Sequence, residues 1–215
     1  ALNLSERDNY YARTILQTDW YQKNFGVSIS SEQGAKVNFD NSSMGGLRAI
    51  SVGGATTGFR GDLLILDDAH NASDGESDAK RSEAVQWFLE TFQTRVNDLD
   101  NTPIVVIGQR IHQEDVYQAA IDLGYEHLNI PMEWDESYRA TTSIGWTDPR
   151  SEEGELMWPA RFSAAAVERL KRALGPYAAA AQLQQTPVPR KGGLIGVDGI
   201  KIVDELPDEP FIAVR

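Results

Sequence analysis

Two uninterrupted apolar runs constrain the fold of this chain more than any other feature. The first is LLIL at residues 63–66, and the second is PIVVI at residues 103–107. Runs of large aliphatic residues are typical of parallel strands that are covered on both faces. Between them, apolar residues at three- and four-residue spacing predict an amphipathic helix over residues 79–99. This order predicts an α/β fold, a mainly parallel sheet with flanking helices.

The rest of the chain predicts further elements around this sheet. They are, in chain order, a helix over residues 4–25 capped by Ser5, short strands at 24–30, 35–40 and 47–52, a helix over 114–123, a third sheet strand at 125–131, and helices over 162–174 and 177–185. We expect one domain over residues 1–186 and a linker over residues 187–215. Within the domain, residues of about 132–186 should form an irregular insert followed by helices.

Composition narrows the classes of function. The net charge of −12 argues against a general nucleic-acid coat, because phosphate binding needs a basic surface, although a local basic groove stays compatible with it. The absence of cysteine excludes disulfides and thiolate metal sites, and only three histidines make a histidine-rich metal site a poor hypothesis. No apolar run approaches the roughly 18 residues of a membrane helix.

Two adjacent aspartates, Asp67 and Asp68, follow the first apolar run directly. Polar residues at the carboxyl ends of parallel strands line the ligand crevice of open α/β sheets. Two carboxylates there are costly unless a cation compensates them. One interpretation is a Walker B motif, in which Asp67 holds the water shell of Mg²⁺ on a nucleotide and Asp68 orients or deprotonates the attacking water. The alternative is a strand that ends in solvent with two acids.

The second run also ends in polar residues, Gln109 and Arg110. A polar side chain on the neighbouring strand tip can contact the γ-phosphate or the lytic water and sense hydrolysis. The alternative is an ordinary surface strand end.

The loop before the first run, GGATTGFRGD, presents Arg60. Gly53 and Gly58 have the spacing of a phosphate-binding loop, but the Lys and the Ser or Thr that bind β/γ-phosphate and Mg²⁺ are missing and a strand follows instead of a helix. We therefore interpret Arg60 as a candidate finger that neutralises transition-state charge on a neighbouring subunit's nucleotide. A solvated or salt-bridged loop arginine is the alternative. No GxxxxGK[S/T] motif occurs in the 215 residues, so a Walker A loop would have to precede Ala1.

Four segments, taken in order, resemble the large subunit of tailed-bacteriophage terminases, the ATPase of the genome-packaging motor. They are GFRGDLLILDDAH, TPIVVIGQRIHQEDV, LMWPARFS and YAAAAQLQQTPVPRKGGLI, and the resemblance covers roughly residues 19–206. It implies an additional-strand P-loop NTPase core, truncated at its N-terminus, and a nuclease domain beyond this chain.

The resemblance also implies the roles of single residues. Asp67 matches the Mg²⁺-associated Walker B acid, Asp68 the catalytic acid, which is Glu in many relatives, and Arg60 a trans-acting arginine finger. Gln109 and Arg110 match the coupling motif, where TRWH is commoner than the QRIH found here. We expect His70 and His112, inside these motifs, to make polar contacts and no chemistry.

The implied function is ATP hydrolysis that drives double-stranded DNA into a procapsid. ATP and Mg²⁺ are the implied cofactors. The implied partners are DNA, held transiently, the portal protein, the small terminase subunit and further copies in a ring, without a membrane. The place of action would be the host bacterial cytoplasm, at the procapsid portal. One alternative is a non-catalytic, prophage-derived module that binds portal or small subunit. Another is a metal-dependent nuclease that uses Asp67 and Asp68, which would need three or four converging carboxylates.

Overall fold

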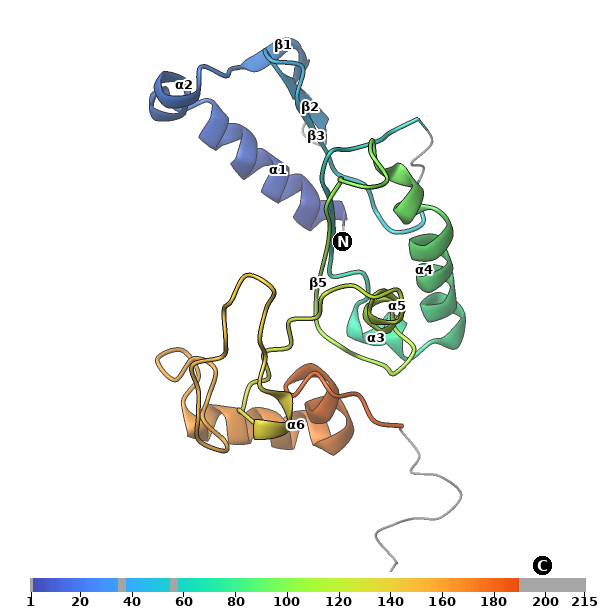
Figure 1. Cartoon of the computed structure of the whole chain (residues 1–215), viewed down its shortest axis with the longest axis vertical. Helices are drawn as coiled ribbons and strands as arrows, with labels where there is room; N and C mark the ends of the chain where they lie inside the picture. Colours follow the sequence, from blue (N-terminus) through green and yellow to red (C-terminus); the bar gives the residue numbers. More distant parts are fainter. Residues whose placement is uncertain (1, 35–37, 55–57, 190–215) are drawn as a thin grey trace, which may run out of the picture.

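The computed structural model describes residues 2–34, 38–54 and 58–189. The two apolar runs form adjacent parallel strands, β4 (Leu64–Asp67) and β5 (Ile104–Ile107), with Leu64 opposite Ile104 and Asp67 opposite Ile107. The Asp68 N–H donates to the Ile107 carbonyl at 3.0 Å, so the pairing continues one step past β4. The fold is mixed α/β, with a small parallel sheet and flanking helices (Figure 1).

One face of this two-stranded sheet packs against helices. These are α4 (Asp78–Glu90), the 3₁₀ turn η1 (Phe92–Arg95) and α5 (Val116–Asp122), while the short helix α3 (Ala72–Gly75) contacts α4. The core consists of Leu64, Leu66, Ala84, Phe88, Phe92, Val96, Val116 and Ala120. Phe88 at its centre has no exposed surface and lies beside the Phe92 ring, with 6.1 Å between ring centroids. The sequence predicted both α4 and α5. The helix predicted over residues 79–99 is shorter, because α4 ends at Glu90 and the chain continues as η1.

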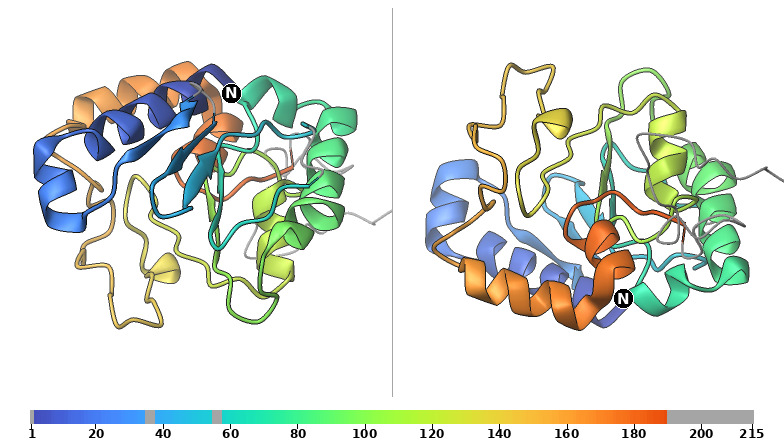
Figure 2. Two further views of the ribbon diagram at one scale, coloured as in Figure 1. Left: turned by 90° about the horizontal axis from the view of Figure 1, so that it is seen from above. Right: turned by 90° about the horizontal axis from the view of Figure 1, so that it is seen from below.

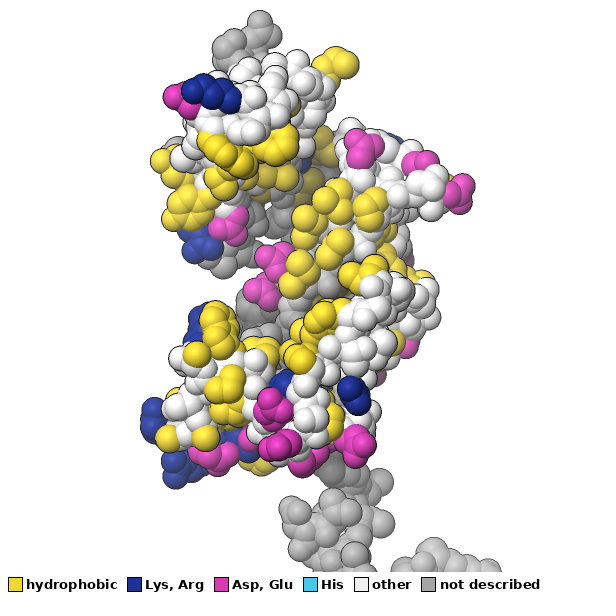
Figure 3. All heavy atoms as spheres, turned by 60° about the vertical axis from the view of Figure 1, so that its left-hand side comes forward, with side chains coloured by type: hydrophobic (Ala, Val, Ile, Leu, Met, Phe, Trp, Pro, Cys, Tyr) yellow, Lys and Arg dark blue, Asp and Glu magenta, His cyan; other side chains and the backbone are white. Residues whose placement is uncertain are grey.

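The opposite face of the sheet is open. Leu63, Ile65, Val105 and Ile107 are between 41% and 55% exposed. Figure 3 looks from this side and shows apolar side chains gathered over the middle of the molecule, between the part with α1 and the part with α6. The prediction that both faces are covered is therefore wrong within the described residues. β4 in fact alternates buried and exposed side chains, and β5 alternates half-buried and exposed ones, as in a sheet covered on one side only.

The N-terminal helix is broken where one helix was predicted. α1 (Leu2–Leu16) ends shortly before α2 (Asp19–Phe25) begins. Thr18 has an extended backbone between them, and its side-chain oxygen caps α2 by accepting the Tyr21 N–H. α1 begins at Leu2, so Ser5, predicted to cap the helix, lies within it.

A small antiparallel sheet follows, with β1 (Ile29–Gly34), β2 (Asn38–Asn41) and β3 (Gly46–Arg48) in sequence order. Of the strand predicted at residues 47–52, only residues 47 and 48 belong to a strand, at the end of β3. The predicted strand at residues 35–40 overlaps β2 at 38–40, and its first three residues lie outside the described ranges.

The C-terminal part packs loops against α6 (Ala164–Gln182). This helix bends at Gly175, whose left-handed φ of 73° separates the two helices that the sequence predicted there. Its buried face joins a second core of Met132, Val167, Ala179 and Leu183. The strand predicted at residues 125–131 does not form, and η2 (Glu136–Tyr138) is the one regular element between α5 and α6.

The views along the long axis place the helices relative to the sheet. In Figure 2, α4 and α5 lie on one side of the sheet strands, and α1 and α6 lie toward the other side. No helix in the described part of the chain is long and apolar enough to span a membrane.

Candidate functional site

The aspartate pair lies at the carboxyl end of β4. Asp67 is the last residue of the strand, and Asp68 turns the chain with a left-handed φ of 46°. Aspartate tolerates this conformation better than most residues, because its short side chain can stabilise the turn locally. Both carboxylates are exposed, and neither has an ion-pair partner among the described residues.

The two carboxylates repel each other. The pKa of Asp68 is raised, first by partial burial and then by the charge of Asp67. A raised pKa means that the ionised form is stabilised less than it would be in water. A cation at this edge of the sheet would relieve both effects, and Mg²⁺ characteristically binds through one or two carboxylates together with phosphates and water. The two carboxylates therefore fit a Mg²⁺ ion that takes its other ligands from phosphates and water.

The tip of β5 lies next to this pair. Gly108 follows the strand, and a Cβ at this position would lie only 1.8 Å from the Tyr117 hydroxyl. Glycine is therefore required here so that Tyr117 of α5 can pack under the strand tips. The structure brings together the two positions that the sequence singled out, the acid pair and the turn that carries Gln109.

Tyr117 is a residue of this site that the sequence did not indicate. It is buried, and its pKa is raised by burial and then by the charge of Asp68. Its hydroxyl has no hydrogen-bond partner among the described residues, although the Ala69 backbone is close enough to lower the pKa slightly. A tyrosine in an amphipathic helix reads as core, so only its contact with Gly108 reveals its position.

The side chains of Gln109 and Arg110 lie in different surroundings. Gln109 is exposed and makes no side-chain hydrogen bond within the described ranges. Arg110 is buried, and its Nε donates to both carboxylate oxygens of Asp115, at 3.0 and 2.9 Å. Its Nη2 donates to Gln118 at 3.0 Å. Arg110 thus forms a structural ion pair behind the strand tip, and its predicted contact with a nucleotide stays a prediction.

Asp115 fixes the loop between β5 and α5. Its side chain is fully buried and caps α5 by accepting the Gln118 N–H at 2.8 Å. It also accepts the backbone N–H groups of Ile111 and His112, at 3.1 and 3.3 Å. Because Gln109 begins this loop, the network determines where the loop leaves the sheet.

The two histidines in the motifs make the polar contacts expected of them. His70 is buried, and its Nε2 accepts the Val116 N–H at 3.0 Å. Burial lowers its pKa, so the neutral acceptor form is favoured. The Nδ1 of His112 accepts the Glu114 N–H at 3.1 Å.

Arg60 lies at the opposite end of the sheet from the acid pair. It precedes β4, whose four residues alone rise about 13 Å. Its Nη1 donates to the Val96 carbonyl at 2.9 Å, and its neighbour Gly61 pairs with the same segment. Arg60 therefore does not meet Asp67 or Asp68 of its own chain.

Within the described ranges, no group of three or more His, Cys, Asp or Glu residues could hold a metal ion by itself. The nuclease alternative thus gains no support there, and a cation at Asp67 would need ligands from elsewhere, such as phosphates and water.

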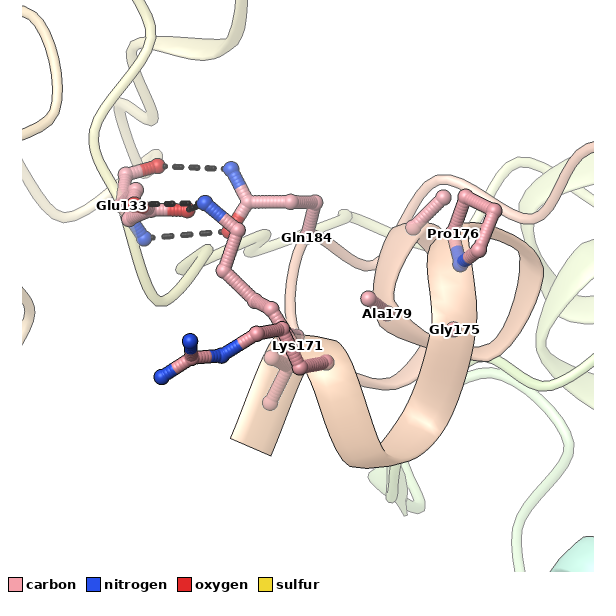
Figure 4. A pocket seen from close by; sticks show the side chains of 9 residues that line it. Glu133, Lys171, Gly175, Pro176, Ala179 and Gln184 are labelled. Atoms are coloured by element: carbon pink, nitrogen blue, oxygen red, sulfur yellow. Dashed lines mark hydrogen bonds and ion pairs between the residues drawn. The ribbon is translucent and has the colours of Figure 1, made fainter. Parts of the chain in front are cut away.

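A cavity of about 510 Å³ lies against the bend of α6 (Figure 4). Several of its polar groups bond to one another. Lys171 forms an ion pair with Glu133 at 3.0 Å, and the Gln184 side-chain amide donates to and accepts from the Glu133 backbone. Arg172 also lines the cavity, and its Nε donates to the Glu168 carbonyl at 3.3 Å. The remaining lining is largely apolar, with Pro176 and Ala179 from α6.

No protein-family model matches this chain, and a search of curated protein sequences finds no match. The functional assignment therefore depends on the residues and on the geometry described above.

Proposed function

We propose that this chain is part of a terminase large subunit, in which magnesium-dependent ATP hydrolysis drives double-stranded DNA into a procapsid. The observation that carries the proposal is the acid pair Asp67–Asp68, which forms no ion pair with the described residues and lies beside the tip of β5. The ordered motifs of the sequence supply the choice of family. The fold would then be the additional-strand type of P-loop NTPase.

Each residue at the strand tips has a role in this proposal. Asp67 holds the water shell of Mg²⁺, and a carboxylate oxygen of Asp68 accepts a hydrogen bond from the attacking water and so orients it. The Gln109 amide contacts the γ-phosphate or this water. When bound, Mg²⁺ neutralises charge on the phosphates. Tyr117, under the strand tips, partly excludes water from the surroundings of Asp68.

The open side of the sheet supports an incomplete site. Ile65 and Ile107 expose a large apolar area, and a two-stranded sheet with one bare face is marginal by itself. We propose that a strand and helix upstream of Ala1 cover this face and carry the phosphate-binding loop, which the 215 residues lack.

Arg60 acts in this proposal on the nucleotide of a neighbouring subunit. Its place at the far end of the sheet from its own acid pair is compatible with action in trans and not in cis. A ring of subunits, contact with portal protein and small subunit, and a place at the procapsid portal in the bacterial cytoplasm all belong to the proposal.

ATP hydrolysis tests the proposal. Residues 1–215 alone should show no significant turnover, because the missing loop would contribute charge-assisted hydrogen bonds worth about 1.5–3 kcal/mol each. The parent protein, extended upstream, should hydrolyse ATP, and Asp67→Ala or Asp68→Ala should each reduce the rate by about 10²-fold or more. Asp98→Ala, which removes an exposed acid in the turn before β5, is the matched control and should have no effect.

Two results would contradict the proposal. Robust turnover by residues 1–215, abolished by Asp67→Ala, would mean that the phosphate site is misplaced. A parent protein without a GxxxxGK[S/T]-like loop would favour the alternative, a non-catalytic module that binds the portal or the small subunit.

A further inference from the structure

A second cavity, of about 570 Å³, lies where the loop after β5 meets the segments on either side of α6. Its lining includes Arg110, His127 and Arg139 and contains no aspartate or glutamate. In a chain with a net charge of −12, a cavity with this lining is a local exception. Its volume lies within the usual range for small-molecule sites.

Several hydrogen-bond donors on the wall of this cavity are open to solvent. Gln113, His127, Tyr138 and Arg139 are exposed, and their side chains make no hydrogen bond or ion pair within the described ranges, so they are accessible to a ligand. The charge of Arg110 is compensated by Asp115 behind it. Arg139 makes no ion pair within the described ranges, although its charge helps to lower the pKa of Asp148, which is paired with Arg150. Arg139 therefore supplies the positive charge that is available to a ligand. The cavity against α6 differs in its lining, which contains the carboxylate of Glu133, ion-paired with Lys171.

We propose that this cavity binds a phosphate group. A phosphate offers acceptor oxygens to an arginine and to neutral donors at once, and an arginine binds it more specifically than a lysine does. Asp67 and Asp68 do not line the cavity, so this site is separate from the proposed nucleotide edge. The phosphate can belong to a small molecule or to the backbone of a nucleic acid, since both present the same oxygens.

An occupant would also contact the segment that carries Gln109. Gln185 lines the cavity, and its side-chain oxygen accepts the Arg110 N–H at 2.8 Å. The end of α6 and the tip of β5 therefore share one wall of this site.

A phosphate titration followed by NMR tests the proposal. The chain has three histidines, so the ring resonances of His127 can be followed beside those of buried His70 as an internal control. Inorganic phosphate, at constant ionic strength, should shift His127 in a saturable way and leave His70 unchanged. Arg139→Gln should weaken this binding roughly tenfold or more, since a charged hydrogen bond is lost.

Arg169→Gln is the matched control. Arg169 is exposed on α6, does not line the cavity, and carries the same charge. Tyr138→Phe, which removes one exposed hydroxyl, should weaken binding to a smaller extent and guards against a folding defect in Arg139→Gln. A His127 shift that does not saturate, or equal weakening by Arg139→Gln and Arg169→Gln, would overturn the proposal.

A short DNA duplex distinguishes the two sources of phosphate. Tighter competition by the duplex than by pyrophosphate assigns the site to a nucleic-acid backbone, and the reverse assigns it to a small molecule. Asp67→Asn should leave the His127 response unchanged, so the outcome is independent of the proposed ATPase.

Discussion

Asp68 combines two features that cost stability, a left-handed backbone and a carboxylate that is partly desolvated and lies beside the charge of Asp67. Its folded-state pKa is raised, so the folded chain holds this proton more tightly than the unfolded chain does. Ionisation of Asp68 thus destabilises the fold at neutral pH, and this cost disappears as the pH falls through the folded-state pKa towards 3.8.

Asp68→Asn should therefore raise the unfolding midpoint at pH 7. Asparagine keeps the side-chain shape, adopts φ near 46° as readily, and carries no charge. The advantage over the wild-type chain should shrink on acidification, because the wild-type carboxylate then becomes neutral too. Thermal unfolding at several pH values measures this difference. Asp98→Asn, whose carboxylate has a lowered pKa from its hydrogen bonds with Asn101, should instead lower the midpoint. A lower midpoint for Asp68→Asn at pH 7 would contradict the repulsion between the two acids.

Single residues were predictable to different degrees. The positions of Asp67, Asp68 and Gln109 follow from strand ends, since parallel strands bring their carboxyl ends to one edge. The direction of Arg110 was not predictable, because its partner Asp115 is brought to it only by the fold of the loop.

At the scale of elements, the loop from β5 to α5 depends on one buried ion pair. Asp115→Ala would remove the cap of α5 and leave the Arg110 guanidinium buried without a counter-charge. Breaking a buried pair in this way costs about 3–5 kcal/mol. Urea denaturation should show a lower midpoint with an unchanged slope.

Asp122→Ala is the control for this change. Asp122 is at the other end of α5, is exposed, and accepts one hydrogen bond from Gln118. Its loss should change the free energy of unfolding by no more than about 0.5 kcal/mol. If Asp115→Ala costs no more than Asp122→Ala, the ion pair does not hold this loop.

Among the elements, long periodic segments were predicted best. The two sheet strands, α4, α5 and the bend of α6 follow from apolar spacing and from Gly175 with Pro176. The break at Thr18 was missed because the apolar face continues through it, and only the local cap decides it. The strand expected at 125–131 has the right composition, but no neighbouring strand pairs with it in the described chain.

The whole molecule is a small α/β core with one covered and one open sheet face. The core on the covered face contains Phe88, Phe92 and Val96, which belong to the apolar pattern that predicted the helix over residues 79–99. Ile65 and Ile107 were predicted to be buried, but both are exposed. The apolar sequence of a strand indicates that both faces are covered, but not which part of a protein covers the second face. This open face lies next to the acid pair, so any segment that covers it can also reach the proposed nucleotide.

The central claim is that a divalent cation with nucleotide binds at the carboxyl ends of β4 and β5. Iron-directed hydroxyl-radical cleavage of the parent protein, with Fe²⁺ in place of Mg²⁺ and ATP present, tests it most directly. The account predicts backbone cleavage near Asp67–Asp68 and near Gly108–Gln109, dependent on nucleotide and lost in Asp67→Asn. Cleavage confined to other segments, or unchanged in Asp67→Asn, would contradict it.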